Sequence, residues 1–251
     1  MQRESGSAEI IEAVIFDVDG VLVETADYHF KAWRRLAEEL EVDFTEEDNE
    51  RLKGVSRMES LEIILEIGEI ELDDEEKRRA AACKNGYYQE YLEEMDESVI
   101  LPGVMEILED LSRSGARLAA ASASKNAPKI MAALPELDAY FETHVFGQDL
   151  DRSKPDPQIF EIAAERLQVN AARCTVVEDA EAGIEAAHRA GMYAVGVGSP
   201  EHLHKAEIVA RGLDELNAAD LLFRNAAPPS VTKVEAQDTS RSGPGPGFQR
   251  Q

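Results

Sequence analysis

Short apolar runs that alternate with helical stripes extend through most of the chain. The runs lie at residues 13–16, 118–121, 143–146, 174–177 and 193–197. Unbroken runs of this length are typical of strands that are buried on both faces of a parallel sheet. Between them, apolar residues recur at helical spacing at 104–111, 159–167 and 184–190. This alternation predicts an α/β fold with a doubly wound parallel sheet.

The segment 28–95 departs from this alternation because it is helix-like throughout. Its apolar residues form three stripes at helical spacing, within residues 30–40, 58–65 and 87–95. The α/β pattern then resumes. We therefore predict that residues 9–25 and 97–225 form an α/β core, and that residues 26–96 form an inserted, all-helical cap domain.

Composition separates a foldable body from a C-terminal tail. The chain has 251 residues, of which 43% are hydrophobic and 31% charged, and this is enough apolar material for a buried core. Residues 226–251 instead combine Pro, Gly, Ser, Thr and Gln with few apolar side chains. Such a segment cannot bury enough surface to offset its ordering entropy, so we predict a disordered tail.

The charge of the chain restricts its partners. Lys and Arg number 26 against 51 Asp and Glu, which gives a net charge of −25. A surface this acidic repels nucleic-acid phosphates and anionic lipid, so we expect neither nucleic acid nor membrane as a partner. The sequence contains no export signal pattern or membrane-length apolar run, and its two cysteines have no metal-site spacing. These features predict a cytoplasmic protein.

Carboxylates follow two of the predicted strands directly. The first strand leads into Asp17-Val18-Asp19-Gly20, and the fourth leads into Glu178 and Asp179. Active sites of open parallel sheets lie outside the carboxyl ends of the strands, so we expect the four acids to meet there. Four carboxylates this close would repel one another or take up protons unless positive charge compensated them. An oxygen-only set of ligands favours Mg²⁺, whereas zinc would call for a His or Cys cluster.

Two further segments suit a phosphate. Ser122-Ala123-Ser124-Lys125-Asn126 ends the second strand and opens a helix, where hydroxyl and backbone N–H groups favour an anion. Lys154 precedes a proline-started helix and can direct its charge at a phosphate. Each signal is weak alone, because Ser and Asn are common helix caps and loop lysines are usually solvated. The agreement of four strand ends predicts a phosphate site beside the acids.

Together these motifs resemble the haloacid dehalogenase superfamily of aspartate-nucleophile phosphotransferases, which has a Rossmann-like core. The superfamily motifs correspond to Asp17-x-Asp19-Gly20, Ser122, Lys154-Pro155 and Glu178-Asp179. A finer similarity is to the β-phosphoglucomutase subfamily. It rests on residues 25–33, 52–57, 121–126 and 182–184. The similarity covers about residues 11–220.

The resemblance implies roles for the acids. Asp17 would be the nucleophile that forms an aspartyl phosphate, and Asp19 would be the general acid and base. Asp17, Asp179 and the backbone carbonyl of Asp19 would bind Mg²⁺, with support from Glu178. Many relatives carry Ser where this chain has Ala180, so we expect somewhat weaker binding of the cation.

The resemblance also implies contacts for the substrate. The transferring phosphoryl group would contact Ser122, Ala123 and Lys154. The rest of the substrate would contact Thr25, His29, Trp33, Gly54, Arg57, Ser124, Lys125 and Asn126. Arg57 would hold the distant phosphate, while Thr25 and His29 would couple cap closure to the position of Asp19. Trp33 also has a plainer interpretation, as part of the core of the cap.

The implied activity is that of an isomerase. It would interconvert β-D-glucose 1-phosphate and D-glucose 6-phosphate through a bound 1,6-bisphosphate. The expected partners are therefore small sugar phosphates and bisphosphates, and we expect a monomer. A sugar-phosphate phosphatase is the alternative, because the same core motifs serve hydrolases. A non-catalytic binding protein would require the loss of Asp17 and Asp19, and both are present.

Overall fold

The computed structural model describes residues 9–52 and 56–224. The predicted tail at 226–251 and the predicted substrate residue Gly54 lie outside the described residues. No helix in the described part of the chain is both long enough and apolar enough to cross a membrane.

A parallel sheet forms the centre of the molecule. Its six strands follow the order β4-β3-β2-β5-β6-β7. Their bounds are β2 (Ala13–Asp17), β3 (Arg117–Ser122), β4 (Thr143–Phe146), β5 (Cys174–Glu178), β6 (Tyr193–Val197) and β7 (Ile208–Ala210). Asp17 pairs with Ala121 on one side, and Phe16 pairs with Val177 on the other. The central strand β2 therefore ends level with both of its neighbours, so their terminal residues face a common space.

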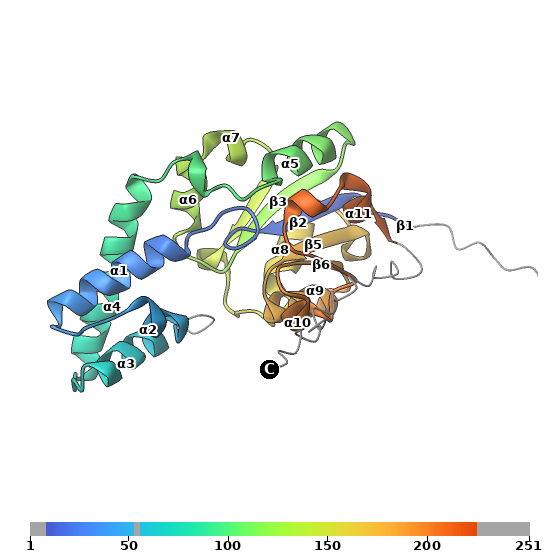
Figure 1. Cartoon of the computed structure of the whole chain (residues 1–251). Helices are drawn as coiled ribbons and strands as arrows, with labels where there is room; N and C mark the ends of the chain where they lie inside the picture. The colour runs from blue at the N-terminus through green and yellow to red at the C-terminus, as the bar shows by residue number, and fades with distance from the viewer. Residues whose placement is uncertain (1–8, 53–55, 225–251) are drawn as a thin grey trace, which may run out of the picture.

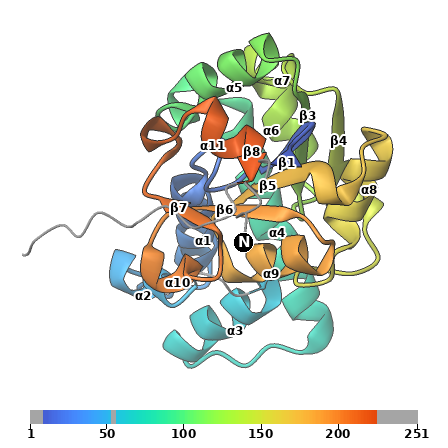
Figure 2. The ribbon, with the colours of Figure 1, turned by 90° about the vertical axis from the view of Figure 1, so that its right-hand side faces the viewer.

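Helices cover both faces of this sheet, as Figure 2 shows. One face carries α5 (Val104–Arg113), α6 (Ala127–Ala133), α7 (Pro135–Asp138) and α11 (Ala218–Leu222). The other carries α8 (Gln158–Arg166), α9 (Glu181–Arg189) and α10 (Pro200–Leu203). Successive residues of β2 point to opposite faces, with Val14 and Phe16 in one apolar cluster and Ile15 in the other. The unbroken apolar runs arise from this two-sided burial, and the predicted doubly wound α/β fold is confirmed.

Four helices form a separate group beside the sheet, on the left of Figure 1. These cap helices are α1 (Ala26–Glu39), α2 (Glu46–Glu50), α3 (Arg57–Ile67) and α4 (Asp74–Glu93). They enclose an apolar cluster of their own that includes Trp33, Leu61 and Ile64. The division into core and cap domains at residues 26 and 96 stays a prediction.

The longest cap helix, α4, links the two groups. It begins at an acidic run in which Asp73 accepts hydrogen bonds from the backbone N–H groups of Glu75 and Glu76, both at 2.8 Å. Acidic side chains suit the positive end of the helix dipole. At its other end, Tyr88 and Leu92 pack into the apolar cluster of the sheet. One helix therefore spans from the cap cluster to the core.

Several short elements have no counterpart in the sequence prediction. An antiparallel pair joins β1 (Glu9–Ile10) to β8 (Phe223–Arg224). Single turns occur at η1 (Glu97–Val99), η2 (Gly147–Asp149), η3 (Ala171–Arg173) and η4 (Leu213–Glu215). The short helix α2 and the edge strand β7 were not predicted either. These elements are too short for a hydrophobic period to be read from them.

Candidate active site

Asp17 ends the central strand and is only 7% exposed. Its carboxylate accepts a hydrogen bond from Nζ of Lys154, which also donates to Oε1 of Glu178. One ammonium group therefore joins the ends of β2 and β5, and the three residues expected to share a site do meet.

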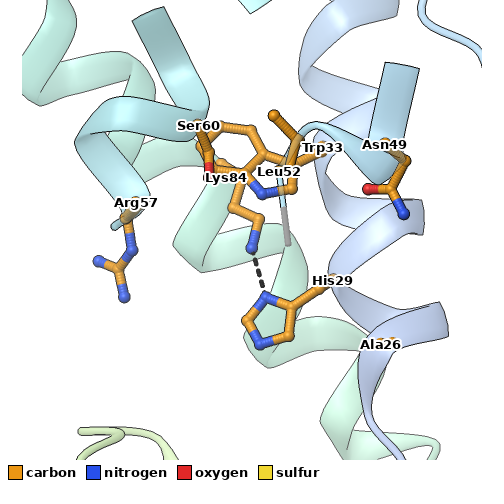
Figure 3. A pocket seen from close by; sticks show the side chains of 8 residues that line it. All are labelled: Ala26, His29, Trp33, Asn49, Leu52, Arg57, Ser60 and Lys84. Carbon is orange, nitrogen blue, oxygen red and sulfur yellow. Dashed lines mark hydrogen bonds between the residues drawn. The ribbon is translucent and has the colours of Figure 1, made fainter. Parts of the chain in front are cut away.

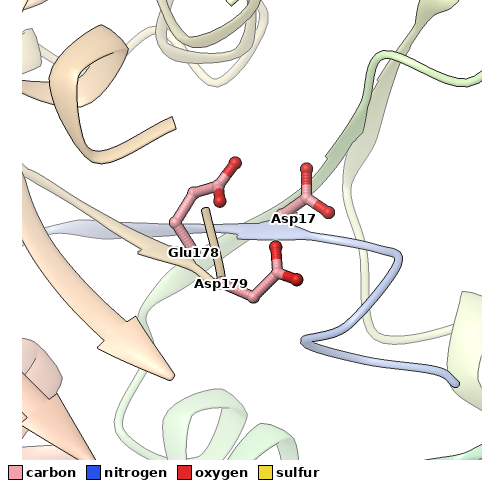
Figure 4. Close-up of side chains that lie close together, drawn as sticks. All are labelled: Asp17, Glu178 and Asp179. Carbon is pink, nitrogen blue, oxygen red and sulfur yellow. The ribbon is translucent and has the colours of Figure 1, made fainter. Parts of the chain in front are cut away.

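Asp179 completes a cluster of three carboxylates with Asp17 and Glu178. One ligand oxygen from each residue can be chosen so that all three lie within 4.8 Å of one another. Figure 4 shows them beside the ends of the two strands. Three carboxylates and the Lys154 ammonium carry a formal charge of −2, which one divalent cation balances. Oxygen-only ligands also suit a hard cation such as Mg²⁺, so the residues present fit such an ion.

The ionisation of these groups reflects their crowding. Burial raises the pKa of Asp17, and the charges of Glu178 and Asp179 raise it further against the pull of Lys154. The pKa of the Asp179 carboxyl group is raised to about 7, first by its removal from water and then by the charge of Glu178. Burial alone would lower the pKa of Lys154, but the attraction of Asp17 and Glu178 outweighs it and raises that pKa. Lys154 is therefore charged, and added positive charge would favour the ionised carboxylates.

Two glycines leave room for the carboxylates. A Cβ atom at Gly20 would lie 2.2 Å from Oδ2 of Asp179, and Gly20 also has a left-handed φ of +81°. A Cβ atom at Gly183, in the first turn of α9, would lie 1.9 Å from Oε1 of Glu178. Both distances are far below contact, so side chains at these positions would displace the acids.

Asp19 lies beyond the strand and makes different contacts from Asp17. Its Oδ1 accepts a 2.5 Å hydrogen bond from the Thr25 hydroxyl, and its Oδ2 lies 3.4 Å from the hydroxyl of Ser122. Burial raises its pKa, while these two hydrogen bonds lower it. Its side chain is not part of the three-carboxylate cluster. The side chain of Asp19 thus lies apart from the three carboxylates and contacts two hydroxyl groups instead.

The segment Ser122–Lys125, which we call the phosphate loop, is held by its own hydroxyl groups. Ser122, at the end of β3, is 2% exposed, and its hydroxyl accepts a 3.1 Å hydrogen bond from the backbone N–H of Ser124. The Ser124 hydroxyl in turn accepts one from the backbone N–H of Asn126, also at 3.1 Å. Ala123 and Lys125 are exposed. The loop therefore presents polar groups next to Asp17 and Asp19.

A second polar region lies among the cap helices. This cap pocket has a volume of about 320 Å³ and is lined by Ala26, His29, Trp33, Asn49, Leu52, Arg57, Ser60 and Lys84. Arg57 and Lys84 are its cationic residues, and no carboxylate is among the described residues that line it. This composition is unusual in a chain with a net charge of −25 and indicates an anion site.

Lys84 is the most buried charged group of the cap pocket. It is 2% exposed, and its Nζ lies 2.7 Å from Nδ1 of His29 and 4.7 Å from the centre of the Trp33 ring. Figure 3 shows Lys84 and His29 joined, with Arg57 reaching the same space from α3. Burial, with a smaller contribution from nearby cations, lowers the pKa of Lys84 to about 7 and that of His29 to about 3. An anion bound here would restore the charge of Lys84.

The predicted site residues therefore fall into two groups. Around the sheet edge lie Asp17, Asp19, Thr25, Ser122, Ala123, Ser124, Lys154, Glu178 and Asp179. His29, Trp33 and Arg57 line the cap pocket, and Trp33 also packs in the cap cluster. Lys125 belongs to the phosphate loop and is exposed.

Sequence reasoning missed Lys84 and did not foresee the surroundings of Asn126. Lys84 stands in the buried helical stripe formed by Ala81, Tyr88 and Leu92, so a lysine within an apolar stripe was the available signal. Asn126 was predicted to contact substrate. The structure places its side-chain amide against the cap residues Asn85 and Gln89.

Comparisons with known proteins show which family the chain belongs to. The family model of haloacid dehalogenase-like hydrolases matches residues 11–191. The chain is 43% identical to a β-phosphoglucomutase of Bacillus subtilis (strain 168) over 208 residues, which cover 82% of this chain and 92% of that protein. It is 38% identical to a phosphorylated carbohydrates phosphatase of Thermotoga maritima over 185 residues, which cover 72% of this chain and 82% of that one.

A solved structure also matches most of this chain. The crystal structure of a β-phosphoglucomutase from Clostridium difficile superposes with a TM-score of 0.71 and 41% identity, and the match covers 83% of this chain and 94% of that one. The likeness extends over the sheet and the cap helices alike, because it spans most of both chains.

Proposed function

The chain belongs to the haloacid dehalogenase-like hydrolase family, and we propose that it is a Mg²⁺-dependent phosphomutase of that family. The proposed reaction interconverts β-D-glucose 1-phosphate and D-glucose 6-phosphate. It proceeds through a phosphoryl group on Asp17 and a bound 1,6-bisphosphate. The identity to a β-phosphoglucomutase over most of both chains supports this proposal.

The two aspartates at the end of β2 divide the chemistry. In the first half, the 6-hydroxyl of glucose 1-phosphate attacks phosphorus on Asp17, the bond from Asp17 to phosphorus breaks, and Asp19 accepts the hydroxyl proton. After the bisphosphate turns round, Asp17 attacks the 1-phosphate, and Asp19 returns the proton to the departing sugar oxygen. The hydrogen bonds from Thr25 and Ser122 hold Asp19 for both transfers.

The remaining polar groups would manage negative charge. Lys154 and Ser122 would hold the phosphoryl oxygens, with the backbone of Ala123 beside them. Asp17, Asp179 and the backbone carbonyl of Asp19 would bind Mg²⁺, and Glu178 would support them. When bound, Mg²⁺ offsets the charge of nucleophile and phosphate, which allows an anion to attack an anion. The side chains of the protein would then orient the reacting groups and exclude water.

The cap pocket is the single observation that favours a mutase over a hydrolase. A mutase must hold a phosphate at each end of the sugar, whereas hydrolysis of a monophosphate needs one phosphate site. Arg57 and Lys84 supply a second cationic site with no lining carboxylate among the described residues. The planar fork of Arg57 suits two-point contact with phosphate.

A sugar-phosphate phosphatase is the second candidate. Its support is the 38% identity to the Thermotoga maritima phosphatase, which shares most of its length with this chain. Both candidates use Asp17 and Asp19. They differ in whether the phosphoryl group passes from Asp17 to a sugar hydroxyl or to water.

The test is to supply β-glucose 1-phosphate, Mg²⁺ and a trace of the 1,6-bisphosphate, and to follow glucose 6-phosphate and free phosphate together. The proposal expects glucose 6-phosphate to exceed free phosphate by a wide margin. Phosphate released in step with loss of substrate would favour the phosphatase.

Arg57→Ala sharpens the distinction. Loss of a desolvated phosphate contact costs roughly 2–5 kcal/mol, so mutase turnover should fall by roughly 30-fold or more. Hydrolysis of a small monophosphate should change much less. Arg34→Ala is the matched control, because Arg34 is an exposed arginine of α1 that pairs with Glu38.

A further inference from the structure

Besides the apolar packing of Tyr88 and Leu92, helix α4 makes polar contacts with the core, and a buried amide is at their centre. Asn126 follows the phosphate loop and is 4% exposed. Its Oδ1 accepts a 2.9 Å hydrogen bond from Nε2 of Gln89, and its Nδ2 donates a 3.0 Å bond to Oδ1 of Asn85. Gln89 also accepts a 3.2 Å bond from Nζ of Lys129 in α6. The cap and the core thus share a polar contact made by both ends of one side chain.

A continuous series of hydrogen bonds leads from this contact to Asp19. The backbone N–H of Asn126 donates to the Ser124 hydroxyl, and the backbone N–H of Ser124 donates to the Ser122 hydroxyl. The Ser122 hydroxyl lies 3.4 Å from Oδ2 of Asp19. The position of Asn126 therefore bears on the phosphate loop and, through it, on the proton-transfer group.

The same helix also enters the cap pocket. Lys84, which reaches His29 in the pocket, immediately precedes Asn85 in the chain. A rigid helix that places Lys84 against one phosphate must at the same time place Asn85 and Gln89 against Asn126. The two phosphate sites are thus mechanically connected by α4.

We propose that Asn85 and Gln89 are positioning residues that hold the phosphate loop in register with the cap helices through Asn126. The inference rests on the proposed function and deepens it. The contact favours transfer of the phosphoryl group from Asp17 to a sugar hydroxyl over transfer to water. In either reaction the bond from Asp17 to phosphorus breaks, and the attacking hydroxyl or water gives its proton to Asp19.

The test measures this partition directly. The protein is labelled on Asp17 with radioactive glucose 1,6-bisphosphate, and loss of label is followed to sugar with added glucose 1-phosphate and to free phosphate without it. Gln89→Leu keeps the bulk of the side chain but removes both of its hydrogen bonds. We expect the ratio of sugar transfer to hydrolysis to fall about tenfold, the order expected for lost hydrogen bonds.

Three further variants separate positioning from general damage. Glu90→Gln is the control, because Glu90 is exposed and pairs with Arg35 at 2.6 Å, away from Asn126. Its ratio should equal that of the wild type. In an Asn126→Ala background, Gln89→Leu should have little further effect, because the proposed action runs through Asn126. If Gln89→Leu does not fold, the same test is made with Asn85→Ala, which removes the hydrogen bond between Asn85 and Asn126.

The outcomes are distinct. An unchanged ratio in Gln89→Leu, with a wild type that transfers phosphate to sugar, overturns this inference alone. An equal fall in both backgrounds also overturns it, since Gln89 would then act without Asn126. A wild type that transfers nothing to sugar overturns the proposed function, and this inference with it.

Discussion

Replacement of Lys84 by methionine should stabilise the protein while it weakens the cap pocket. Lys84 is 2% exposed, and burial lowers its pKa from the ordinary 10.5 to about 7. Since one pKa unit corresponds to about 1.4 kcal/mol, the charged form costs the folded state roughly 5 kcal/mol at pH 6. Methionine removes this cost, but it also loses the hydrogen bond to His29, which reduces the gain in stability by about 1–3 kcal/mol. The free energy of unfolding of Lys84→Met should therefore exceed that of the wild type by about 2–4 kcal/mol at pH 6.

The size of this gain in stability depends on pH. Below pH 7 both the folded and the unfolded protein keep the Lys84 proton, so the cost is constant. Between about pH 7 and 10.5 only the unfolded chain binds that proton, so the stability of the wild type rises with pH. The advantage of Lys84→Met should shrink across this window.

Urea unfolding at pH 6, 7.5 and 9 tests the reasoning. Trp33 is the only tryptophan in the sequence and lies 4.7 Å from Nζ of Lys84, so its fluorescence reports on the cap helices. Lys31→Met on α1 replaces an exposed lysine and should change stability by no more than about 0.5 kcal/mol. A variant at Lys84 that is less stable than the wild type at pH 6, or a gap that does not narrow with pH, refutes the argument.

The remaining predictions concern the sheet edge. Asp17→Asn should abolish turnover in the coupled mutase assay, because an amide cannot form the acyl phosphate. Asp19→Asn should slow phosphoryl transfer in single turnovers by about 10²–10⁴-fold and leave Mg²⁺ binding in a titration intact, because the three-carboxylate cluster is unchanged. Ala180→Ser should raise the free energy of unfolding in urea by about 1 kcal/mol, because Ala180 is the N-cap of α9 and makes no side-chain capping bond.

The sequence predicted the core best where burial is two-sided. Each strand expected from an apolar run is present within one residue of the predicted bounds, from β2 to β6. These strands lie between two helical layers, so nearly all their side chains must be apolar, and a continuous pattern results. Asp17, Ser122 and Glu178 could be placed for the same reason, because each follows directly from the end of a buried run.

The cap helices were harder to interpret, because their function depends on contacts across many residues. Lys84 meets His29 from 55 residues away, and Gln89 meets Asn126 from 37 residues away. Helical periodicity predicts which face of a helix a residue occupies, but not which distant residue it contacts. The role predicted for Asn126 stays a prediction, and the structure adds that both ends of its amide contact α4.

Two lysines of this acidic chain have opposite shifts in pKa, because their surroundings differ. Lys154 lies between Asp17 and Glu178, and their charges keep it protonated. Together with the Lys154 ammonium, the three carboxylates have a formal charge of −2, which fits a divalent cation. Lys84 has no such partner among the described residues that line the cap pocket, so burial lowers its pKa to about 7. Above pH 7 its charge is restored when an anion arrives, which links binding at the cap to uptake of a proton. The binding of a bisphosphate at pH 8 should therefore take up a proton in the wild type and none at this position in Lys84→Met, which calorimetry in buffers of different ionisation enthalpy would measure.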